Sequence, residues 1–205
     1  DFSQVEARGL LWLAGDEAGL DDYRAGRDPY KRVAGTIYGI PAASVDKQQR
    51  TAGKVSVLAC GYSGGRKAIL RMAAKYRISL DGLDPQKIVE GWRDTYSLVA
   101  GERTGRYWEG TACRRGGLWK NLRKALDERT SAAAGRVHFF VVPGGVACEL
   151  PSGRRLLYRD LREEPDGDRT ILTYANARAT RTKLYGGRLC ENVIQALCRD
   201  LLSAA

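Results

Sequence analysis

The sequence predicts an α+β fold in which a mostly helical region is followed by a small antiparallel β meander and a last helix. Residues 7–130 carry apolar side chains at helical spacing, with Asp and Pro at several helix starts. Residues 136–174 contain short strand-like runs separated by Pro-Gly and Ser-Gly turns. Helices followed by strands argue against a doubly wound parallel sheet.

The first thirty residues predict one strand and three helix starts. Residues 1–6 (DFSQVE) alternate enough to predict a short strand, and residues 7–14 (ARGLLWLA) predict a helix. Asp16 caps a second helix. Asp28 and Pro29 open a third, since an Asp side chain accepts N–H bonds at a helix start and Pro fits the first turn.

The following hundred residues predict further helices. A long helix is expected over residues 44–61, with Ser44 at its start, and two more over 65–81 and 85–99. The segment 105–129 is expected to be helical in its later part.

The meander is expected from four strand-like runs, at 136–142, 146–150, 155–158 and 170–174. Turns separate them, and the last is the polar segment 163–168. The amphipathic stretch 189–202 is the final helix.

Charge and cysteine content narrow the classes of partner and cofactor. The 205 residues carry a formal net charge of +10, which favours a polyanionic partner because Lys and Arg on phosphates release counterions. The five cysteines form no C-x-x-C pair and His138 is the sole histidine, so we expect reduced thiols and no zinc site. No apolar run reaches the length of a membrane span, so no membrane partner is expected and the predicted location is the cytoplasm.

Residues 61–65 (GYSGG) match the G-x-S-x-G pattern of a hydrolase nucleophile elbow. With Ser63 as the nucleophile, Asp127 and His138 follow in the order that an α/β-hydrolase triad requires. An α/β-hydrolase fold needs several strands before the elbow, however, whereas residues 1–52 are predicted to be mostly helical. The competing hypothesis places Ser63 in the loop that ends a helix.

The residues before this loop form a stripe if they are helical. Arg50, Lys54, Leu58 and Tyr62 recur at every fourth position and therefore line one slanting face. Two cations followed by an apolar and an aromatic residue suit a polyphosphate, a sugar and a base. The same spacing also suits a solvated Arg/Lys edge beside a core Leu and Tyr, so both interpretations stay open.

Two paired signatures give the chain a resemblance to a known family. Residues 1–8 (DFSQVEAR), together with Arg50, Lys54 and Tyr62, resemble the two hallmark motifs of the family A DNA polymerases. The segments GRDPYKRVAGTIYGIP, LPSGRRLLY and KLYGGRLCENVIQALCRDLL are similar to the phage-type branch. The resemblance covers essentially the whole chain.

The resemblance implies a fold of helical fingers, a β meander and a palm fragment. Residues 1–20 would be a palm strand with its following helix, residues 21–130 the helical fingers region, and residues 131–205 the meander and the late palm helix. The implied activity is template-directed nucleotidyl transfer in DNA replication, from a deoxynucleoside triphosphate (dNTP) to a primer 3′-hydroxyl, in a bacterial or phage-infected cell.

The resemblance also assigns roles to individual residues. Asp1 would be a catalytic carboxylate that holds Mg²⁺ together with the Phe2 carbonyl, for two-metal chemistry. Glu6 would lie under the nucleotide sugar and exclude a 2′-hydroxyl. The implied nucleotide-binding residues are Gln4, Glu6, Tyr30, Arg50, Lys54, Leu58 and Tyr62. Residues on the late helix that would contact DNA are Arg188, Asn192 and Gln195.

Several features depart from the family pattern. Leu58 stands where the best-known members have Phe, Tyr30 stands where cellular members have a phosphate-contacting His, and Ser63 separates Tyr62 from the following Gly. The sequence contains no His-Asp pair, which the family uses for its second catalytic carboxylate.

We therefore expect a polymerase fragment that binds primer–template DNA and dNTP but is inactive alone. The remainder of the polymerase or a complementing chain would supply the missing carboxylate. The alternative is a non-catalytic nucleic-acid-binding remnant, and a Ser63 hydrolase is a more distant third hypothesis.

Overall fold

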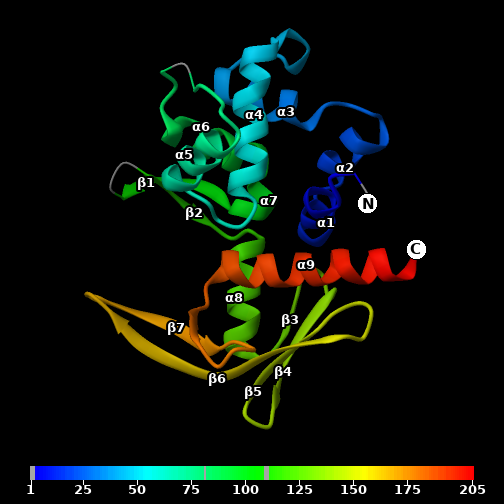
Figure 1. The fold of residues 1–205 in the computed structure, drawn as a ribbon, viewed down its shortest axis with the longest axis vertical. Helices are drawn as coiled ribbons and strands as arrows, with labels where there is room; N and C mark the ends of the chain where they lie inside the picture. Colours follow the sequence, from blue (N-terminus) through cyan, green and yellow to red (C-terminus); the bar gives the residue numbers. More distant parts are fainter. Residues whose placement is uncertain (1–2, 81, 109–110) are drawn as a thin grey trace.

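The structure is a computed structural model that describes residues 3–80, 82–108 and 111–205. As predicted, it is an α+β fold (Figure 1). Its helices, counting the 3₁₀ turn η1, are α1 Val5–Ala14, α2 Glu17–Arg24, α3 Pro29–Tyr38, η1 Ala42–Ser44, α4 Lys47–Cys60, α5 Arg66–Lys75, α6 Pro85–Thr95, α7 Ser97–Ala100, α8 Leu118–Glu128 and α9 Gly186–Ala204.

The strands form two antiparallel sheets. A hairpin pairs β1 Glu102–Trp108 with β2 Thr111–Arg115. The larger sheet is a six-stranded meander in which every strand pairs with the next along the chain. Its strands are β3 Ser131–Ala132, β4 Val137–Val142, β5 Gly145–Glu149, β6 Arg155–Asp166, β7 Arg169–Ala175 and β8 Arg181–Lys183.

The helical region and the meander share one apolar core. Figure 1 shows helices α2 to α7 on one side of the molecule and the meander on the other, with α9 crossing above the sheet. Trp92 of α6, Leu122 of α8 and Phe139 of β4 are all buried in the same cluster. Helix α1 packs on α9, where Gly9 leaves space for Ile194 and Cys198. The site described below therefore rests on a continuous core.

Helices α3 and α4 cross with their backbones in contact. A Cβ atom at Gly53, in the middle of α4, would overlap the carbonyl oxygen of Tyr30 in α3. Only a glycine permits this approach, because every other residue adds a side chain at that point. The crossing fixes Tyr30 beside the first turns of α4.

Several predicted element boundaries are confirmed, and local hydrogen bonds explain them. Asp16 accepts a hydrogen bond from Gly19 N at 2.8 Å at the start of α2. Asp28 accepts one from Tyr30 N at 2.9 Å at the start of α3. Both caps act within three residues, so sequence alone could identify them.

The predicted strand over residues 1–6 is wrong in its described part. Val5 and Glu6 already belong to α1, and Arg8 N donates to the Gln4 carbonyl at 3.0 Å to close the first turn. A strand needs a hydrogen-bonded neighbour, whereas a helix satisfies its backbone locally. Asp1 and Phe2 lie outside the described residues.

Three predicted helix ends also need correction. Helix α4 begins at Lys47 rather than residue 44, because Asp46 and Gln49 form a capping box. Helix α5 ends at Lys75, six residues early, because Arg77 adopts the left-handed conformation. The predicted helix 85–99 is divided into α6 and α7 at Tyr96, whose backbone is not helical.

The sequence prediction missed the β1–β2 hairpin and two short strands, β3 and β8. It also placed a turn over residues 163–168, where β6 continues to Asp166 because Glu163, Glu164 and Pro165 pair with strand β7. Only the later part of the segment 105–129 is helical, as expected, and forms α8.

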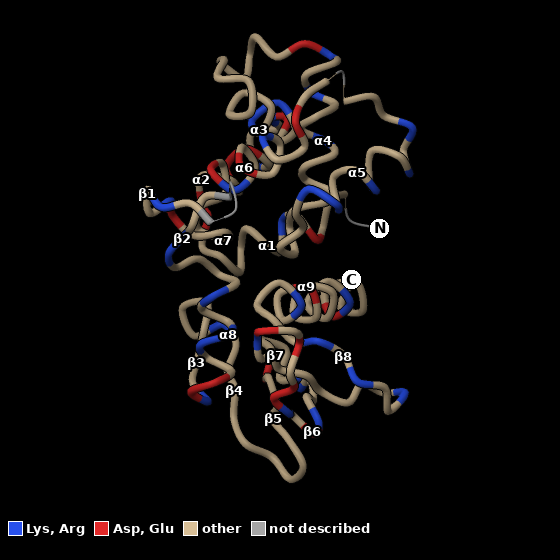
Figure 2. The backbone as a smooth tube through the Cα atoms, turned by 90° about the vertical axis from the view of Figure 1, so that its left-hand side faces the viewer, with Lys and Arg blue, Asp and Glu red and all other residues tan. Residues whose placement is uncertain are grey.

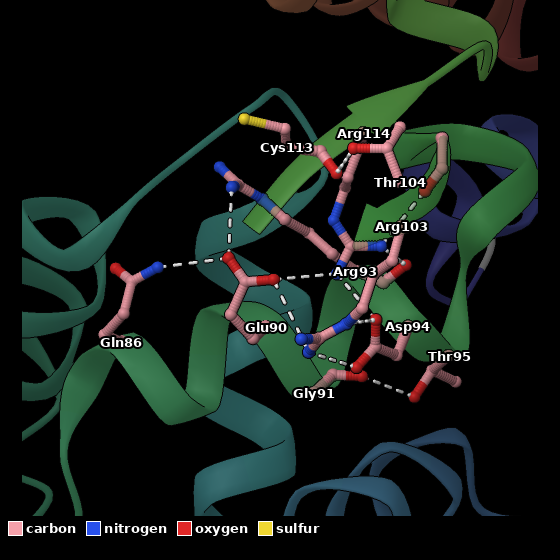
Figure 3. Close-up of polar contacts among 11 residues, drawn as sticks. Gln86, Glu90, Gly91, Arg93, Asp94, Thr95, Arg103, Thr104, Cys113 and Arg114 are labelled. Atoms are coloured by element: carbon pink, nitrogen blue, oxygen red, sulfur yellow. Dashed lines mark hydrogen bonds and ion pairs between the residues drawn. The ribbon is translucent and has the colours of Figure 1, made fainter. Parts of the chain in front are cut away.

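A network of charged side chains fastens the hairpin to α6 (Figure 3). Arg103 of β1 donates two hydrogen bonds to Asp94, at 2.7 and 2.6 Å. Arg114 of β2 lies opposite Arg103 in the hairpin and contacts Glu90 at 2.8 Å and Asp94 at 2.6 Å. The Arg114 side chain is only 6% exposed. Loss of one partner would leave the buried Arg114 guanidinium without its full charge compensation, so the network ties the hairpin to α6.

The crossing of α3 and α4 predicts the effect of a single methyl group. We expect Gly53→Ala to lower the free energy of unfolding by about 1–3 kcal/mol, because the added carbon meets backbone atoms that cannot rotate away. Gly9→Ala is the control, since its Cβ would make ordinary contacts 3.7 Å or more away. That variant should gain up to about 1 kcal/mol from helix propensity. Urea unfolding measures both, and equal effects would contradict the close crossing.

The network predicts a dependence of stability on pH. Burial raises the pKa of Asp94, but the hydrogen bonds from Arg103 and Arg114 outweigh it and hold the pKa below its ordinary value of 3.8. The stabilisation from the ionised carboxylate is therefore present above about pH 4 and is lost as the pH falls through the lowered pKa.

The difference in unfolding free energy between wild type and Asp94→Asn should thus be largest near pH 6 and shrink towards pH 2. Asp127→Asn, which removes a carboxylate from the exposed pair with Arg123, is the control and should cost no more than about 1 kcal/mol. Denaturant unfolding at a series of pH values measures both. An Asp94→Asn effect that does not change with pH would contradict the network's role.

Candidate functional site

A cavity of about 370 Å³ lies where α1, α3 and the end of α4 meet. Five residues predicted to bind a nucleotide line it: Gln4, Glu6, Tyr30, Leu58 and Tyr62. They come from three segments that are distant in the sequence. The fold therefore brings together residues that sequence analysis selected separately.

The floor and walls of the cavity include residues that the sequence analysis missed. Three aromatic side chains belong to this group: Tyr23 of α2, Trp92 of α6 and Tyr96 at the end of α6. Burial raises the pKa of Tyr23 to about 12, so its hydroxyl stays protonated at neutral pH. All three aromatic residues lie at the spacing of ordinary core residues on amphipathic helices. Only the folded chain distinguishes them as cavity walls.

Arg50 lies beside Tyr30 because of the close crossing of α3 and α4. Its guanidinium stacks over the Tyr30 ring, 4.9 Å from the ring centre, and its Nε donates to the Asp28 carboxylate. Asp28 also caps α3 through the Tyr30 N–H. One carboxylate thus orients both the aromatic ring and the cation.

Lys54 lies one turn further along α4 and points to a different neighbour. Its Nζ is 5.8 Å from the centre of the Tyr76 ring, just beyond the end of α5. Neither Arg50 nor Lys54 lines the cavity itself, whereas Leu58 does and is 40% exposed. The predicted stripe therefore runs from two cations outside the cavity to an apolar residue and an aromatic residue at its wall.

Tyr62 is the last residue of the stripe and is bound to Glu6, which also lines the cavity. Its hydroxyl donates a hydrogen bond to Glu6 Oε2 at 2.8 Å. Burial raises the pKa of Tyr62, and the hydrogen bond to Glu6 raises it further. The bond connects α1 with the residues just after α4, at the wall of the cavity.

The G-x-S-x-G stretch is a loop after α4, as one of the two hypotheses predicted. In this loop Ser63 has a positive φ, 66°, whereas Gly61, Gly64 and Gly65 do not. Gly64 serves a different purpose, because a Cβ there would overlap the Ala59 carbonyl oxygen. The loop in turn lies against Gly187, at the start of α9.

The other members of the hypothetical triad have different partners. His138 Nδ1 lies 3.0 Å from Ser131 Oγ, in the adjacent strand. Asp127 accepts from Arg123 Nε at 2.9 Å. The described contacts therefore give no support to a Ser63 hydrolase.

The three residues predicted to contact DNA lie on α9, away from the cavity walls. Arg188 pairs with Glu191 at 2.7 Å, and Asn192 Nδ2 donates to the Tyr158 hydroxyl at 3.4 Å. Gln195 is exposed. The start of this helix lies beside Tyr62, since a Cβ at Gly187 would overlap the Tyr62 carbonyl oxygen. The two groups of predicted residues therefore adjoin at one point.

The predicted metal ligands, Asp1 and Phe2, lie outside the described residues. Within residues 3–80, 82–108 and 111–205, no group of three or more His, Cys, Asp or Glu side chains could hold a metal ion. None of the helices in this part of the chain is long and apolar enough to cross a membrane.

The hydrogen bond at the cavity wall predicts an energetic coupling between Glu6 and Tyr62. A double-mutant cycle with Glu6→Ala and Tyr62→Phe should give a coupling free energy of about 1 kcal/mol, as expected for a partly exposed hydrogen bond. Thermal or urea unfolding of the four proteins measures it. Strictly additive effects would show that the two side chains do not interact in solution.

Comparison with known proteins agrees with the sequence signatures. No protein-family model matches the chain. The chain is 33% identical to the DNA polymerase of Bacillus phage SP02 over 215 aligned residues, which cover 99% of this chain and 31% of the phage protein. It is 39% identical over 54 residues to the thermostable DNA polymerase I of Thermus aquaticus, which covers 26% of this chain and 6% of that protein.

The chain thus spans about a third of the length of its phage relative. These matches to two DNA polymerases, with the paired signatures, are consistent with a fragment of a family A DNA polymerase.

Proposed function

We propose that the chain forms the dNTP-binding and part of the DNA-binding surface of a template-directed DNA polymerase. The observation that carries this proposal is the cavity in which Gln4, Glu6, Tyr30, Leu58 and Tyr62 meet. A cavity with apolar walls and a few polar groups is the usual form of a small-molecule site. Arg50 and Lys54 lie on the helix that forms one of its walls.

Arg50 and Lys54 would hold the triphosphate. Within the described part of the chain, only Nε of Arg50 bonds to Asp28, so the two terminal nitrogens remain for a bidentate contact with phosphate oxygens. Lys54 presents a compact charge whose current neighbour is an aromatic ring rather than a carboxylate. The two side chains are one turn apart, about 6 Å along the helix axis, which suits adjacent phosphates.

The cavity would take the sugar and base of the incoming nucleotide. Leu58 offers an apolar surface for the sugar, and Tyr62 would stand at the position of the templating base. Glu6 would lie under the sugar and exclude a 2′-hydroxyl. Glu6 accepts a hydrogen bond from the Tyr62 hydroxyl, so a nucleotide at this position would have to rearrange this bond.

Mg²⁺ is the proposed cofactor, held by the Asp1 carboxylate and the Phe2 carbonyl. The described residues do not form a metal centre by themselves, so their geometry supports no metal-dependent step. When bound, two such ions would activate the primer 3′-hydroxyl and stabilise the displacement at phosphorus. The described side chains would act by binding and orienting the nucleotide.

Primer–template DNA would lie against α9, where Arg188, Asn192 and Gln195 are located. The second catalytic carboxylate would come from the remainder of a polymerase or from a complementing chain, because this sequence has no His-Asp pair. The same observation favours a second candidate function, a nucleic-acid-binding remnant without catalysis.

Nucleotide binding tests the proposal directly. A fluorescent primer–template should bind the 205-residue protein, and adding the complementary dNTP with Mg²⁺ should tighten binding. Arg50→Ala with Lys54→Ala should weaken the dNTP effect about tenfold or more, since each lost charge-assisted bond is worth about 1.5–3 kcal/mol. Arg159→Ala with Arg169→Ala removes the same charge from exposed positions and is the control.

A primer-extension assay separates the alternatives. We expect no extension by the 205-residue protein, so robust Mg²⁺-dependent synthesis would contradict the proposed inactivity. DNA binding that ignores dNTP and survives the Arg50 and Lys54 substitutions would instead favour the non-catalytic remnant.

A further inference from the structure

Trp119 connects the wall of the cavity to the part of the molecule that carries the meander. It is the second residue of α8 and is only 8% exposed. Its indole Nε1 donates a hydrogen bond to the Gly61 carbonyl at 3.0 Å. Gly61 and Tyr62 line the cavity, whereas Trp119 contacts Gly61 from outside the cavity lining. An indole from α8 thus holds the backbone at the end of α4, next to the proposed nucleotide site.

The Gly61 carbonyl is a group that a helix cannot satisfy by itself. Gly61 ends α4 with helical φ and ψ of −52° and −29°, and the last carbonyls of a helix have no N–H partner within it. When a carbonyl withdrawn from water loses its donor, it must either stay unpaired at a cost in free energy or move to another donor. Loss of the Trp119 N–H would therefore favour a different path of the chain through Gly61 and Tyr62.

The start of α9 packs against the same two segments. A Cβ at Gly186 would lie 2.1 Å from the Trp119 carbonyl oxygen, and a Cβ at Gly187 would lie 2.5 Å from the Tyr62 carbonyl oxygen. Neither glycine has a positive φ, so space rather than backbone conformation requires them. Figure 2 shows α9 between α1 and the meander, with α8 beside it. Trp119, Tyr62 and the two glycines of α9 therefore form one packed unit.

A second contact links Trp119 to the cavity. Its ring stacks on the Trp92 ring, with ring centres 5.9 Å apart and planes at 8°. Trp92 is 2% exposed and lines the cavity, and its ring centre lies 5.1 Å from that of Tyr96, which also lines the cavity. The Trp119 indole therefore contacts the cavity wall in two ways, through its N–H on Gly61 and through its ring on Trp92.

Tyr62 is fixed at both of its ends. Trp119 holds the peptide group that precedes it, while Gly187 packs against its carbonyl oxygen. At the other end, the Tyr62 hydroxyl donates to Glu6 at 2.8 Å. The backbone contacts and the hydroxyl contact act on one residue, so the loss of one should weaken the other.

We propose that Trp119 is a positioning residue for the nucleotide site. Its N–H holds the Gly61 carbonyl, so the Tyr62 ring stays at the cavity wall and the site is formed before a nucleotide arrives. This inference rests on the proposed function of the cavity and adds to it a residue that touches no nucleotide. Without the bond, a smaller fraction of molecules has the arrangement that binds, and the apparent affinity falls by that fraction.

The experiment separates the N–H of Trp119 from its ring. Trp119→Phe keeps an aromatic ring and removes the donor. Trp119→His loses the outer ring that stacks on Trp92, but its Nε2–H can occupy the ring position of the indole N–H. Leu122→Val is the control, because it removes a methylene from the same helix at a fully buried position outside the cavity lining. Circular dichroism and urea unfolding establish that each variant is folded.

The first measurement is the coupling between Glu6 and Tyr62, which needs no nucleotide. The cycle with Glu6→Ala and Tyr62→Phe is repeated in each of the three backgrounds. The coupling should fall to less than about half in Trp119→Phe, stay at its wild-type value in Leu122→Val, and largely recover in Trp119→His. Equal coupling in Trp119→Phe and Leu122→Val would overturn the proposal. A loss in Trp119→His as large as in Trp119→Phe would assign the effect to the ring and overturn the role of the N–H.

The second measurement is the effect of dNTP on primer–template binding. We expect Trp119→Phe to reduce the dNTP-dependent tightening about two- to fivefold, which corresponds to at most one hydrogen bond of ordinary strength. Its binding to primer–template without dNTP should keep the wild-type value, as should both values in Leu122→Val. An unchanged dNTP effect in Trp119→Phe would overturn the proposal. If the wild type itself shows no dNTP effect, the proposed function fails, and the Glu6–Tyr62 coupling alone decides whether Trp119 positions Tyr62.

Discussion

The site depends on the contact between the backbones of α3 and α4 at Gly53 and Tyr30. This contact lets the two helix backbones approach as closely as a glycine allows. It lets the Arg50 guanidinium stack on the Tyr30 ring, and it directs the end of α4 towards α1, where Tyr62 reaches Glu6. A larger residue at position 53 would push the two helices apart. The cavity walls that α3 and α4 contribute would then move relative to each other.

Arginine side chains of this protein occur in two contrasting environments. On the β1–β2 hairpin, Arg103 and Arg114 are surrounded by the carboxylates of α6, and their charge is used to hold the hairpin in place. On α5 the cations face solvent with no acidic neighbour in the sequence. In the first arrangement carboxylates of the same chain compensate the charge, whereas in the second no described carboxylate does so. Net charge alone cannot separate these cases, because it counts both kinds of arginine equally.

Sequence reasoning succeeded where the determining contacts are local. The caps at Asp16 and Asp28 act within three residues, and the spacing from Arg50 to Tyr62 is fixed by helix geometry alone. It failed where distant residues decide. The hairpin is stabilised by Glu90 and Asp94 of another element, so its own residues carry little strand signal. The extension of β6 to Asp166 requires a partner strand that offsets a Glu-Glu-Pro sequence typical of a turn.

The candidate site shows the same difference between residues set by local sequence and residues set by distant contacts. The residues on α4 and in the first motif could be named from the sequence, because spacing and family resemblance both point to them. Tyr23, Trp92 and Tyr96 could not be named, because their helices carry them at ordinary core spacing. The roles of all these residues in binding stay predictions. What the fold adds is that five of the named residues share one cavity, while Arg50 and Lys54 approach it from outside.

The base of the β1–β2 hairpin has a consequence for how this chain can vary. Gly101 and Gly117 stand at its two ends, both with positive φ, and a Cβ at either would overlap backbone at the other end. The chain therefore leaves the helical region and returns to it at nearly the same point. Because the gap between α7 and α8 is already closed there, changes of length beyond the Arg103–Arg114 pair would leave this closure in place. Two glycines and one group of ion pairs join the hairpin to the helical region. The length of the hairpin beyond these contacts can therefore change independently of the rest of the fold.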